Sequence, residues 1–233
     1  MNPRILLLSL VLILSSFKTT SKSDYLVTDY GIIGDAKTLN TSAIQNLIDQ
    51  VSEKGGGKII FPGGKFLSGS IELKDDIELY FEAEAVLLGS KNPFDYKKVV
   101  SKDTLPTRHG TALISAHLRN NIKLTGSGTI NGQGGYLALA LDSLYYADPD
   151  AYFKISKSYN ERRKRPNEGG RPNLIFLNQS KNIQIKGVTL KNGAEWVTKI
   201  ELCDSIEIDQ IKLESDVYWN NDGIDLVDSK NVR

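Results

Sequence analysis

Cysteine is almost absent from this sequence. Cys203 is the only one among 233 residues, so no intrachain disulfide can form. A chain exported without disulfides must be held together by its hydrophobic core, which excludes a small stapled scaffold and favours a large, well-packed domain. Cys203 follows the apolar residues Ile200 and Leu202, and we expect its thiol to be buried.

Excess charge of one sign and metal-ligand patterns are also lacking. Lys and Arg number 29 and Asp and Glu 28, a net charge of +1, so nothing indicates nucleic acid as a partner. The chain has two histidines, His109 and His117, and no His, Cys, Asp and Glu spacing typical of a metal site. The sequence therefore predicts no metal and no other cofactor.

A nearly unbroken apolar run, residues 5–14, follows Arg4 at the start of the chain. Such a run behind one positive charge is typical of a secretory signal peptide, and it is too short to span a bilayer core of about 30 Å as a helix. We predict a signal peptide at residues 1–22 and export to the periplasm or the cell exterior, with no stable membrane insertion after signal removal. A short membrane anchor is the alternative, because the sequence shows no A-x-A-like cleavage site.

One amphipathic helix is predicted after residue 41. Apolar residues recur at i, i+3, i+4 and i+7 from Ile44, the spacing of a single helix face. Ser42 with Gln45 forms a possible capping box, and the glycines at 55–57 end the helix. We expect this helix to cover the apolar N-terminal end of the fold.

A short repeat indicates the fold class. The segments "KNIQIKGVTL" (181–190) and "DSIEIDQIKL" (204–213) carry apolar residues at the same offsets, 0, 2, 5 and 7, and lie 23 residues apart. Offsets 0 and 2 share one face of a strand, and the odd step to 5 requires a bend in the chain. A strand, a corner and a second strand that repeat in phase form one coil of a solenoid. We predict an all-β, right-handed parallel β-helix over residues 23–233 with an N-terminal capping helix. A β-sandwich of short strands is the competing architecture.

The stretch from about 133 to 170 does not follow the repeat. It is rich in tyrosine and then basic, and we expect a long, partly helical insertion between two coils. Insertions in solenoids usually fall on one side, often the binding side. The basic run at 162–165 is either a solvated charge cluster or a contact for an acidic ligand.

Four blocks of the sequence resemble glycoside hydrolase family 28, the polygalacturonase family. They are residues 29–49, 55–90, 171–197 and 220–232, which follow the order of the family and leave the insertion out. The resemblance implies a β-helical glycosidase that hydrolyses the O-glycosidic bonds of pectic polysaccharide or oligogalacturonide with inversion. It also implies a monomer when the protein is complete.

The motif Asn-Thr-Asp-Gly of that family matches Asn220, Asn221, Asp222 and Gly223, with Asn221 in place of Thr. The resemblance assigns to Asp222 a part in activating the attacking water. The Asp-Asp pair, the Gly-His-Gly turn and the Arg-x-Lys pair of the family have no match, so the general acid would lie beyond Arg233. The chain then resembles the N-terminal portion of a longer enzyme, truncated within its site. Its uncapped last coil is expected to favour association.

The candidate site residues are Asp222 as a catalytic carboxylate and Asn220, Trp196 and Lys199 as substrate-binding residues. Inverting hydrolysis needs an acid and a base carboxyl about 6.5–9.5 Å apart. Coils that stack about 4.8 Å apart can bring such groups together. Trp196 and Lys199 lie one coil before the acidic turn. There the Trp196 ring can stack on the face of a sugar, and the Lys199 cation can pair with the carboxylate of a uronate. The residues alone leave other interpretations open: Asp222 as a turn aspartate before glycine, Trp196 as buried and Lys199 as facing solvent.

Two functional hypotheses follow from the sequence. The first is a pectin-degrading glycosidase, and the second is a non-catalytic or degenerate β-helix that binds polysaccharide. A calcium-dependent pectate lyase is the nearest chemical rival. It would need clustered carboxylates and an arginine that acts as the base, and we identify neither in the sequence. The exact substrate and the choice between endo and exo action stay open.

Overall fold

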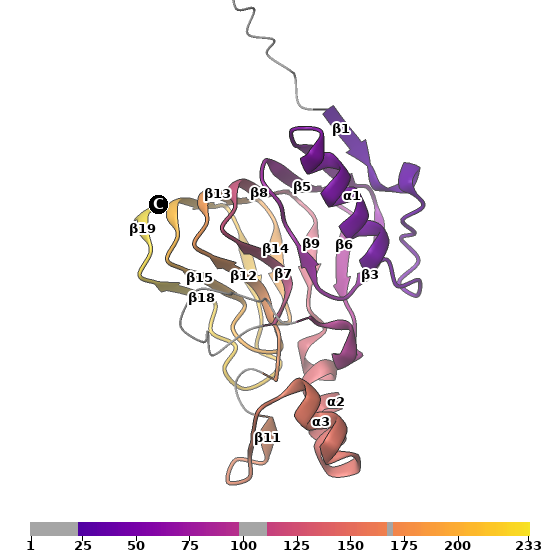
Figure 1. Cartoon of the computed structure of the whole chain (residues 1–233), viewed down its shortest axis with the longest axis vertical. Helices are drawn as coiled ribbons and strands as arrows, with labels where there is room; N and C mark the ends of the chain where they lie inside the picture. The colour runs from indigo at the N-terminus through magenta and orange to yellow at the C-terminus, as the bar shows by residue number, and fades with distance from the viewer. Residues whose placement is uncertain (1–22, 98–110, 167–169) are drawn as a thin grey trace, which may run out of the picture.

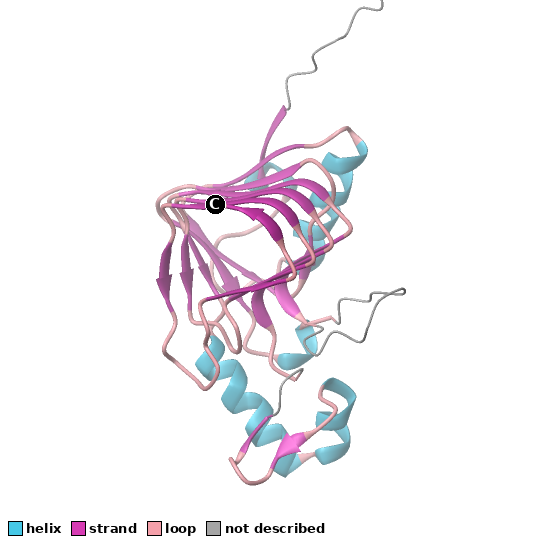
Figure 2. Cartoon of the chain, turned by 90° about the vertical axis from the view of Figure 1, so that its left-hand side faces the viewer, coloured by secondary structure: helices cyan, strands magenta, loops and turns pink. Residues whose placement is uncertain are grey.

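The chain folds as a parallel β-helix. The computed structural model describes residues 23–97, 111–166 and 170–233, so the predicted signal peptide and His109 lie outside the described part. Three sheets of parallel strands wind along one axis, with the C-terminus at the far end of the stack (Figures 1 and 2). The predicted fold class is confirmed, and the β-sandwich alternative is wrong.

Each complete coil contributes one strand to each of the three sheets, and β1 and β19 extend sheet A at its two ends. In order across sheet A lie β1 (Ser23–Leu26), β2 (Gly57–Phe61), β5 (Ile77–Phe81), β8 (Asn120–Gly126), β13 (Lys181–Lys186), β16 (Asp204–Asp209) and β19 (Lys230–Val232). Sheet B contains β3 (Gly64–Ser68), β6 (Ala85–Gly89), β9 (Thr129–Asn131), β14 (Thr189–Lys191) and β17 (Lys212–Glu214). Sheet C contains β4 (Ile71–Glu72), β7 (Ala112–His117), β12 (Asn173–Asn178), β15 (Thr198–Glu201) and β18 (Ile224–Val227).

The sequence repeat corresponds to one coil. Ile183 pairs with Ile206 in sheet A, and Leu190 pairs with Leu213 in sheet B. Ile183, Ile206 and Leu190 are buried inside the helix of strands. Full burial of such a side chain stabilises the fold by about 1.5–3 kcal/mol, and each coil adds several of them. The stacking of like residues therefore makes a continuous core.

Two successive corners between sheet A and sheet B, in the coils of β8 and β13, are glycines. Gly187 has φ +78°, and a Cβ at this position would lie 2.3 Å from the main-chain oxygen of Gly126 in the preceding coil. Gly126 has φ +111°, and a Cβ at this position would lie 2.1 Å from the main-chain oxygen of Phe81. Glycine allows both the left-handed backbone and the close approach of the corners. This corner is the odd step that the repeat pattern requires.

Helix α1 (Thr41–Glu53) packs its apolar face on the first coils. The buried residues of that face are Ile44, Leu47, Ile48 and Val51. The predicted capping box is wrong: Asn40 occupies the N-cap without a side-chain cap bond, and Gln45 instead binds the main chain of Glu72 in β4. Two short 3-10 helices, η1 (Val27–Tyr30) and η2 (Pro93–Asp95), complete the N-terminal half.

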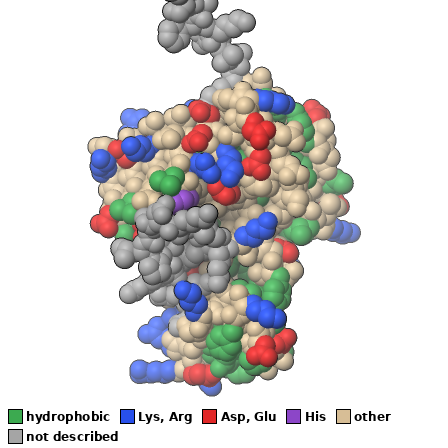
Figure 3. All heavy atoms as spheres, viewed as in Figure 1, with side chains coloured by type: hydrophobic (Ala, Val, Ile, Leu, Met, Phe, Trp, Pro, Cys, Tyr) green, Lys and Arg blue, Asp and Glu red, His purple; other side chains and the backbone are tan. Residues whose placement is uncertain are grey.

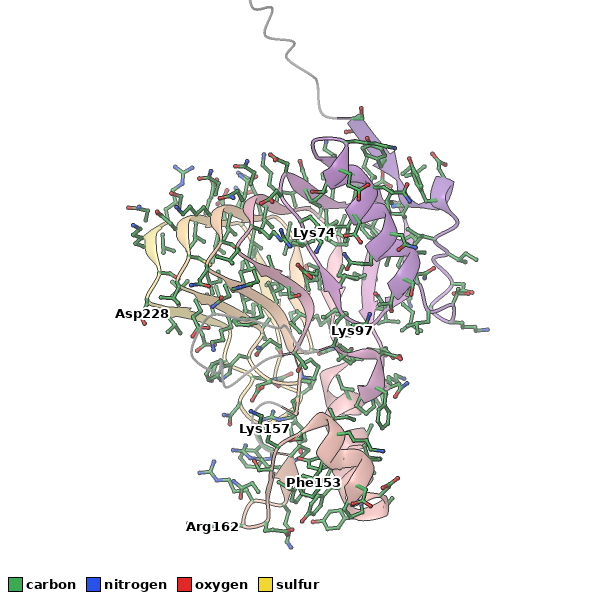
Figure 4. The ribbon with its side chains drawn as sticks, in the orientation of Figure 1. Lys74, Lys97, Phe153, Lys157, Arg162 and Asp228 are labelled. Atoms are coloured by element: carbon green, nitrogen blue, oxygen red, sulfur yellow. The ribbon has the colours of Figure 1, made fainter. Side chains whose placement is uncertain are left out.

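A helical segment projects from the β-helix between β9 and β12. It consists of α2 (Gly134–Ala147), α3 (Pro149–Ile155), β10 (Tyr159–Asn160) and β11 (Arg165–Pro166), seen below the sheets in Figures 1 and 2. Its core is aromatic, with the rings of Tyr145 and Tyr159 stacked at 3.8 Å between centroids. Residues 162–164 are exposed, and the side chain of Arg162 points away from the body of the protein in Figure 4. Arg165 is different, because it is buried.

The last described coil exposes its inward positions. Ile224 and Leu226 are 42% and 46% exposed, whereas Ile200, which pairs with Leu226 from the preceding coil, is fully buried. In a solenoid each coil buries the inward face of its neighbour. Ile224 and Leu226 therefore occupy the positions that are buried in the preceding coil.

The thiol of Cys203 lies in the core, as the sequence predicts, at 1% exposure. Burial raises the pKa of this thiol to about 11. Because the thiolate is the reactive form, we expect the native protein at pH 8 to react with a disulfide reagent at least about 100-fold more slowly than the urea-unfolded chain. Cys203 is the only cysteine of these 233 residues, so in the polypeptide of residues 1–233 the absorbance change reports Cys203 alone. Rapid stoichiometric labelling of the native protein would contradict the prediction.

Candidate functional site

The outer face of sheet C carries a row of side chains, one from each strand, and all but Phe176 are polar. Strand register aligns Glu72, Ser115, Phe176, Lys199 and Asp225, from β4 to β18. Inward and outward side chains alternate along a strand, and the neighbours of these residues, such as Ile114 and Ile200, fill the core. Sheet C therefore has an apolar inner face and a largely polar outer face.

A second row runs beside the first on the same face. His117, Asn178 and Glu201 occupy equivalent positions in three successive strands. His117 Nδ1 lies 2.8 Å from Asn178 Oδ1, and Asn178 Nδ2 donates to Glu201 Oε2 at 3.1 Å. This hydrogen-bonded row holds Glu201 in a fixed position beside Lys199.

Lys199 is enclosed by aromatic rings. Its Nζ lies 5.2 Å from the ring centre of Phe176 and 5.6 Å from that of Trp196, and 3.7 Å from Glu201 Oε1. Lys199 is only 4% exposed, whereas Trp196 is partly exposed. The alternatives of a solvent-facing lysine and a buried tryptophan are therefore wrong. The charged group is instead held by two ring faces and one carboxylate.

Asp222 lies on the turn that leads into β18, directly next to Trp196 in the stack. Thr198 and Ile224 are register partners, which places Trp196 and Asp222 at equivalent positions of adjacent coils. The main-chain oxygen of Asp222 accepts a hydrogen bond from Val197 N at 2.8 Å. Its side chain is exposed. The structure thus brings Asp222, Trp196, Lys199 and Asp225 to one end of the sheet C face.

Asn221 fastens this turn to the preceding coil. Its Nδ2 donates to the main-chain oxygens of Gly193 and Glu195, at 2.7 and 2.9 Å, and its Oδ1 accepts from Tyr218 N at 2.8 Å. A threonine has no amide that could make the two donor bonds. The substitution of Asn for Thr in the motif therefore has a structural use here.

Asn220 faces the inserted segment. It adopts a left-handed backbone, with φ 57°, and its Oδ1 accepts a hydrogen bond from Arg165 Nη1 at 3.3 Å. The guanidinium carbon of Arg165 also lies 5.5 Å from the ring centre of Trp219. The insertion thus contacts the turn that bears Asp222, and Asn220 is the link.

Arg171 and Glu195 form a buried ion pair under the same turn. Arg171 is 1% and Glu195 0% exposed, and Arg171 Nη2 lies 3.6 Å from Glu195 Oε1. Arg171 Nη1 donates to the main-chain oxygens of Ala194 at 2.7 Å and Trp219 at 2.6 Å. The ion pair therefore joins the turns of two coils.

A groove of about 560 Å³ lies on the same face at its other end, between α1 and sheet C. Lys74 and Arg119 both donate to Glu72 Oε1, at 2.9 and 3.0 Å. Burial raises the pKa of Glu72, but the hydrogen bonds from these two cations outweigh it and hold the pKa below its usual value. Figure 3 shows basic and acidic side chains close together here, and Figure 4 labels Lys74 and Lys97 along the groove.

The part of the chain that the structure describes contains no cluster of three or more His, Cys, Asp or Glu side chains able to hold a metal ion. In the same residues, no helix combines the length and apolar character that a membrane-spanning helix needs.

Fold and site together define a class, the parallel β-helix proteins with a polar candidate site on the outer face of one sheet. The chain belongs to glycoside hydrolase family 28, because the family model, Glycosyl hydrolases family 28, matches residues 52–233. The resemblance seen in the four sequence blocks is confirmed.

Relatives of known name agree with this membership. A Vitis vinifera protein named "Probable polygalacturonase" is 29% identical over 216 residues, covering 88% of this chain and 40% of the relative. The exo-poly-alpha-D-galacturonosidase of Dickeya chrysanthemi is 28% identical, covering 88% of this chain and 38% of the relative. The family 28 exopolygalacturonase structure from Yersinia enterocolitica matches with TM-score 0.70 and 26% identity, over 91% of this chain and 42% of that chain. The chain spans about two fifths of the length of these relatives.

Sequence reasoning missed the residues that hold the turn in place. Arg171, Glu195 and Arg165 carry no periodicity or spacing that separates them from ordinary surface charges. Only Glu195 has a usable signal, since it precedes Trp196 and lies one coil before the acidic turn.

Proposed function

We propose that this chain is part of a glycosidase that hydrolyses pectic polysaccharide with inversion, and that Asp222 helps to activate the attacking water. One observation carries the proposal. In a chain of family 28, Asp222 is exposed on a turn that hydrogen bonds hold to the preceding coil, beside the side-chain row on the outer face of sheet C. Inverting hydrolysis requires a second carboxyl as general acid, about 6.5–9.5 Å from the base. By resemblance, the acid would come from a coil that stacks on β18.

The same proposal assigns substrate contacts to Trp196, Lys199 and Asn220. Trp196 offers a partly exposed ring next to Asp222, and Lys199 supplies a positive charge between that ring and Phe176. Uronate rings carry one carboxylate each, so a ring face beside a cation suits an acidic sugar. Asn220 would act from the far side of the turn, where Arg165 orients it.

The wider setting is also proposed. The apolar run behind Arg4 supports export through a signal peptide at residues 1–22, to the periplasm or the cell exterior. The substrate class of the named relatives, polygalacturonate, supports a role in the degradation of plant cell-wall pectin. The resemblance to the family supports a monomer.

The test is release of reducing ends from polygalacturonate and from rhamnogalacturonan by the polypeptide expressed from the whole open reading frame. Sequencing of that frame past the codon for Arg233 comes first, because an Asp-Asp pair about one coil beyond Asp222 supports the hydrolase. Release of a product of inverted anomeric configuration supports the proposal. Binding of polygalacturonate without any release would sink it and favour the non-catalytic β-helix.

A further inference from the structure

Trp219 is a large aromatic side chain exposed beside the candidate catalytic turn. It is 66% exposed, the highest value among the large hydrophobic residues described, and Asp222 follows three residues later. A tryptophan ring buries a large apolar area when a partner covers it, so a ligand that packs on Trp219 would gain a large apolar contact.

The backbone that carries Trp219 is held rigidly. The main-chain oxygen of Trp219 accepts from buried Arg171 at 2.6 Å, and the preceding residue, Tyr218, donates its N–H to Asn221. The guanidinium of Arg171 also lies 5.3 Å from the ring centre of Tyr218. A side chain on such a fixed segment loses little conformational entropy when a ligand packs against it.

Arg165 places a positive charge against the indole. It reaches the ring from β11 of the insertion, with its guanidinium carbon 5.5 Å from the ring centre, and is 7% exposed. Among the described residues no carboxylate lies within 4.0 Å of the Arg165 guanidinium. Burial, followed by the charge of the Asp142 carboxylate, raises the pKa of nearby Tyr218, but this carboxylate accepts a hydrogen bond from Tyr159. A cation so deeply buried needs compensation, and here the ring face of Trp219 and the Asn220 oxygen contribute to it.

We propose that Trp219 and Arg165 form a binding subsite for one uronate ring of an acidic polysaccharide. The C–H face of the pyranose packs on the exposed face of the indole, and Arg165 attracts the uronate carboxylate from the insertion side. The subsite rests on the proposed function, which supplies the polysaccharide class. It adds the residues that select an acidic ring next to Asp222, and gives the insertion a part in specificity.

The test measures binding of trigalacturonate by calorimetry, in the whole reading-frame protein with Asp222→Asn to prevent turnover. Trp219→Ala is expected to raise Kd at least about tenfold, and Trp219→Phe, which keeps a smaller ring, to raise it less. Arg165→Met is expected to weaken trigalacturonate and leave a neutral galactose trisaccharide within about twofold. Tyr136→Ala is the matched control, because Tyr136 is 64% exposed with Lys91 Nζ 4.1 Å from its ring centre but lies on α2.

Several results would overturn the subsite. One is a Kd for Trp219→Ala within about twofold of the parent, with an unchanged unfolding midpoint. A second is no detectable binding of trigalacturonate by the parent protein. A third is a Trp219 ring that acrylamide cannot quench in a protein whose other tryptophans, Trp196 included, are replaced by phenylalanine, since a covered ring cannot stack on a sugar. Reducing-end release by the protein with Asp222 intact tests the hydrolase separately. If trigalacturonate binding depends on Trp219 but no hydrolysis is detected, the proposed reaction is rejected and the subsite is supported.

Discussion

Asp222→Asn is expected to lower kcat for polygalacturonate hydrolysis by about 10³-fold or more in the protein expressed from the whole reading frame. The amide has the shape of the carboxylate but cannot accept a proton from the attacking water. Folding should be unaffected, because Asp222 contacts the preceding coil through its main-chain oxygen, which accepts from Val197 N at 2.8 Å. Reducing-end release measures the rate, and thermal unfolding measures the stability.

Asp228→Asn is the control for this substitution. Asp228 is exposed at the end of β18 in the same coil, has φ 47°, and lies at the edge of the molecule in Figure 4. Asparagine tolerates the left-handed backbone as well as aspartate does, so activity and stability should match the parent. If Asp222→Asn retains turnover within about tenfold, Asp222 is only a turn residue.

Arg171→Met is expected to lower the free energy of unfolding by about 3–5 kcal/mol, the effect of breaking a buried ion pair by removing one partner. The substitution leaves the fully buried Glu195 without its cation and removes the hydrogen bonds to the Ala194 and Trp219 oxygens. Urea unfolding followed by circular dichroism gives the value. Arg171→Lys should recover only part of the loss, since one ammonium does not reproduce the planar guanidinium.

Two comparisons separate burial from charge. Arg119→Met removes a cation that pairs with Glu72 at 3.0 Å but is 28% exposed, and we expect a change of about 0–1 kcal/mol. Adding Glu195→Gln to Arg171→Met removes the uncompensated charge and should restore part of the stability. A loss below about 1 kcal/mol for Arg171→Met would show that the ion pair does not hold the two turns together.

The repeat predicts most of the fold, for a geometrical reason. Each coil must bury the same inward positions, so Ile183 and Ile206 fall in phase along the sequence and in register in sheet A. The same regularity places Trp196 next to Asp222, one coil away, before any coordinates are known. Glycine at the corner is also visible in the sequence, because Gly187 allows a left-handed backbone where adjacent corners meet.

Charged residues show where the sequence has no such rule. Lys199 reads as a surface lysine, yet the rings of Phe176 and Trp196 enclose it. Arg165 belongs to a basic run whose other members are exposed, and it alone turns inward to Trp219. A buried cation is stable only when side chains or main-chain groups from distant segments contact it, and the sequence pattern does not show those contacts.

The sequence by itself determined the β-helix, its capping helix and the turn that carries Asp222, because periodic burial of apolar side chains is a local and repeated constraint. Only the tertiary structure decided how that turn is held. Arg171 lies 24 residues before Glu195, about one coil, but the repeat records apolar positions and does not mark the two as charge partners. Arg165 lies 54 residues before Trp219, and its contact depends on the path of the insertion. A buried charge is specified by the three-dimensional arrangement of its partners, and a repeat specifies only what every coil shares.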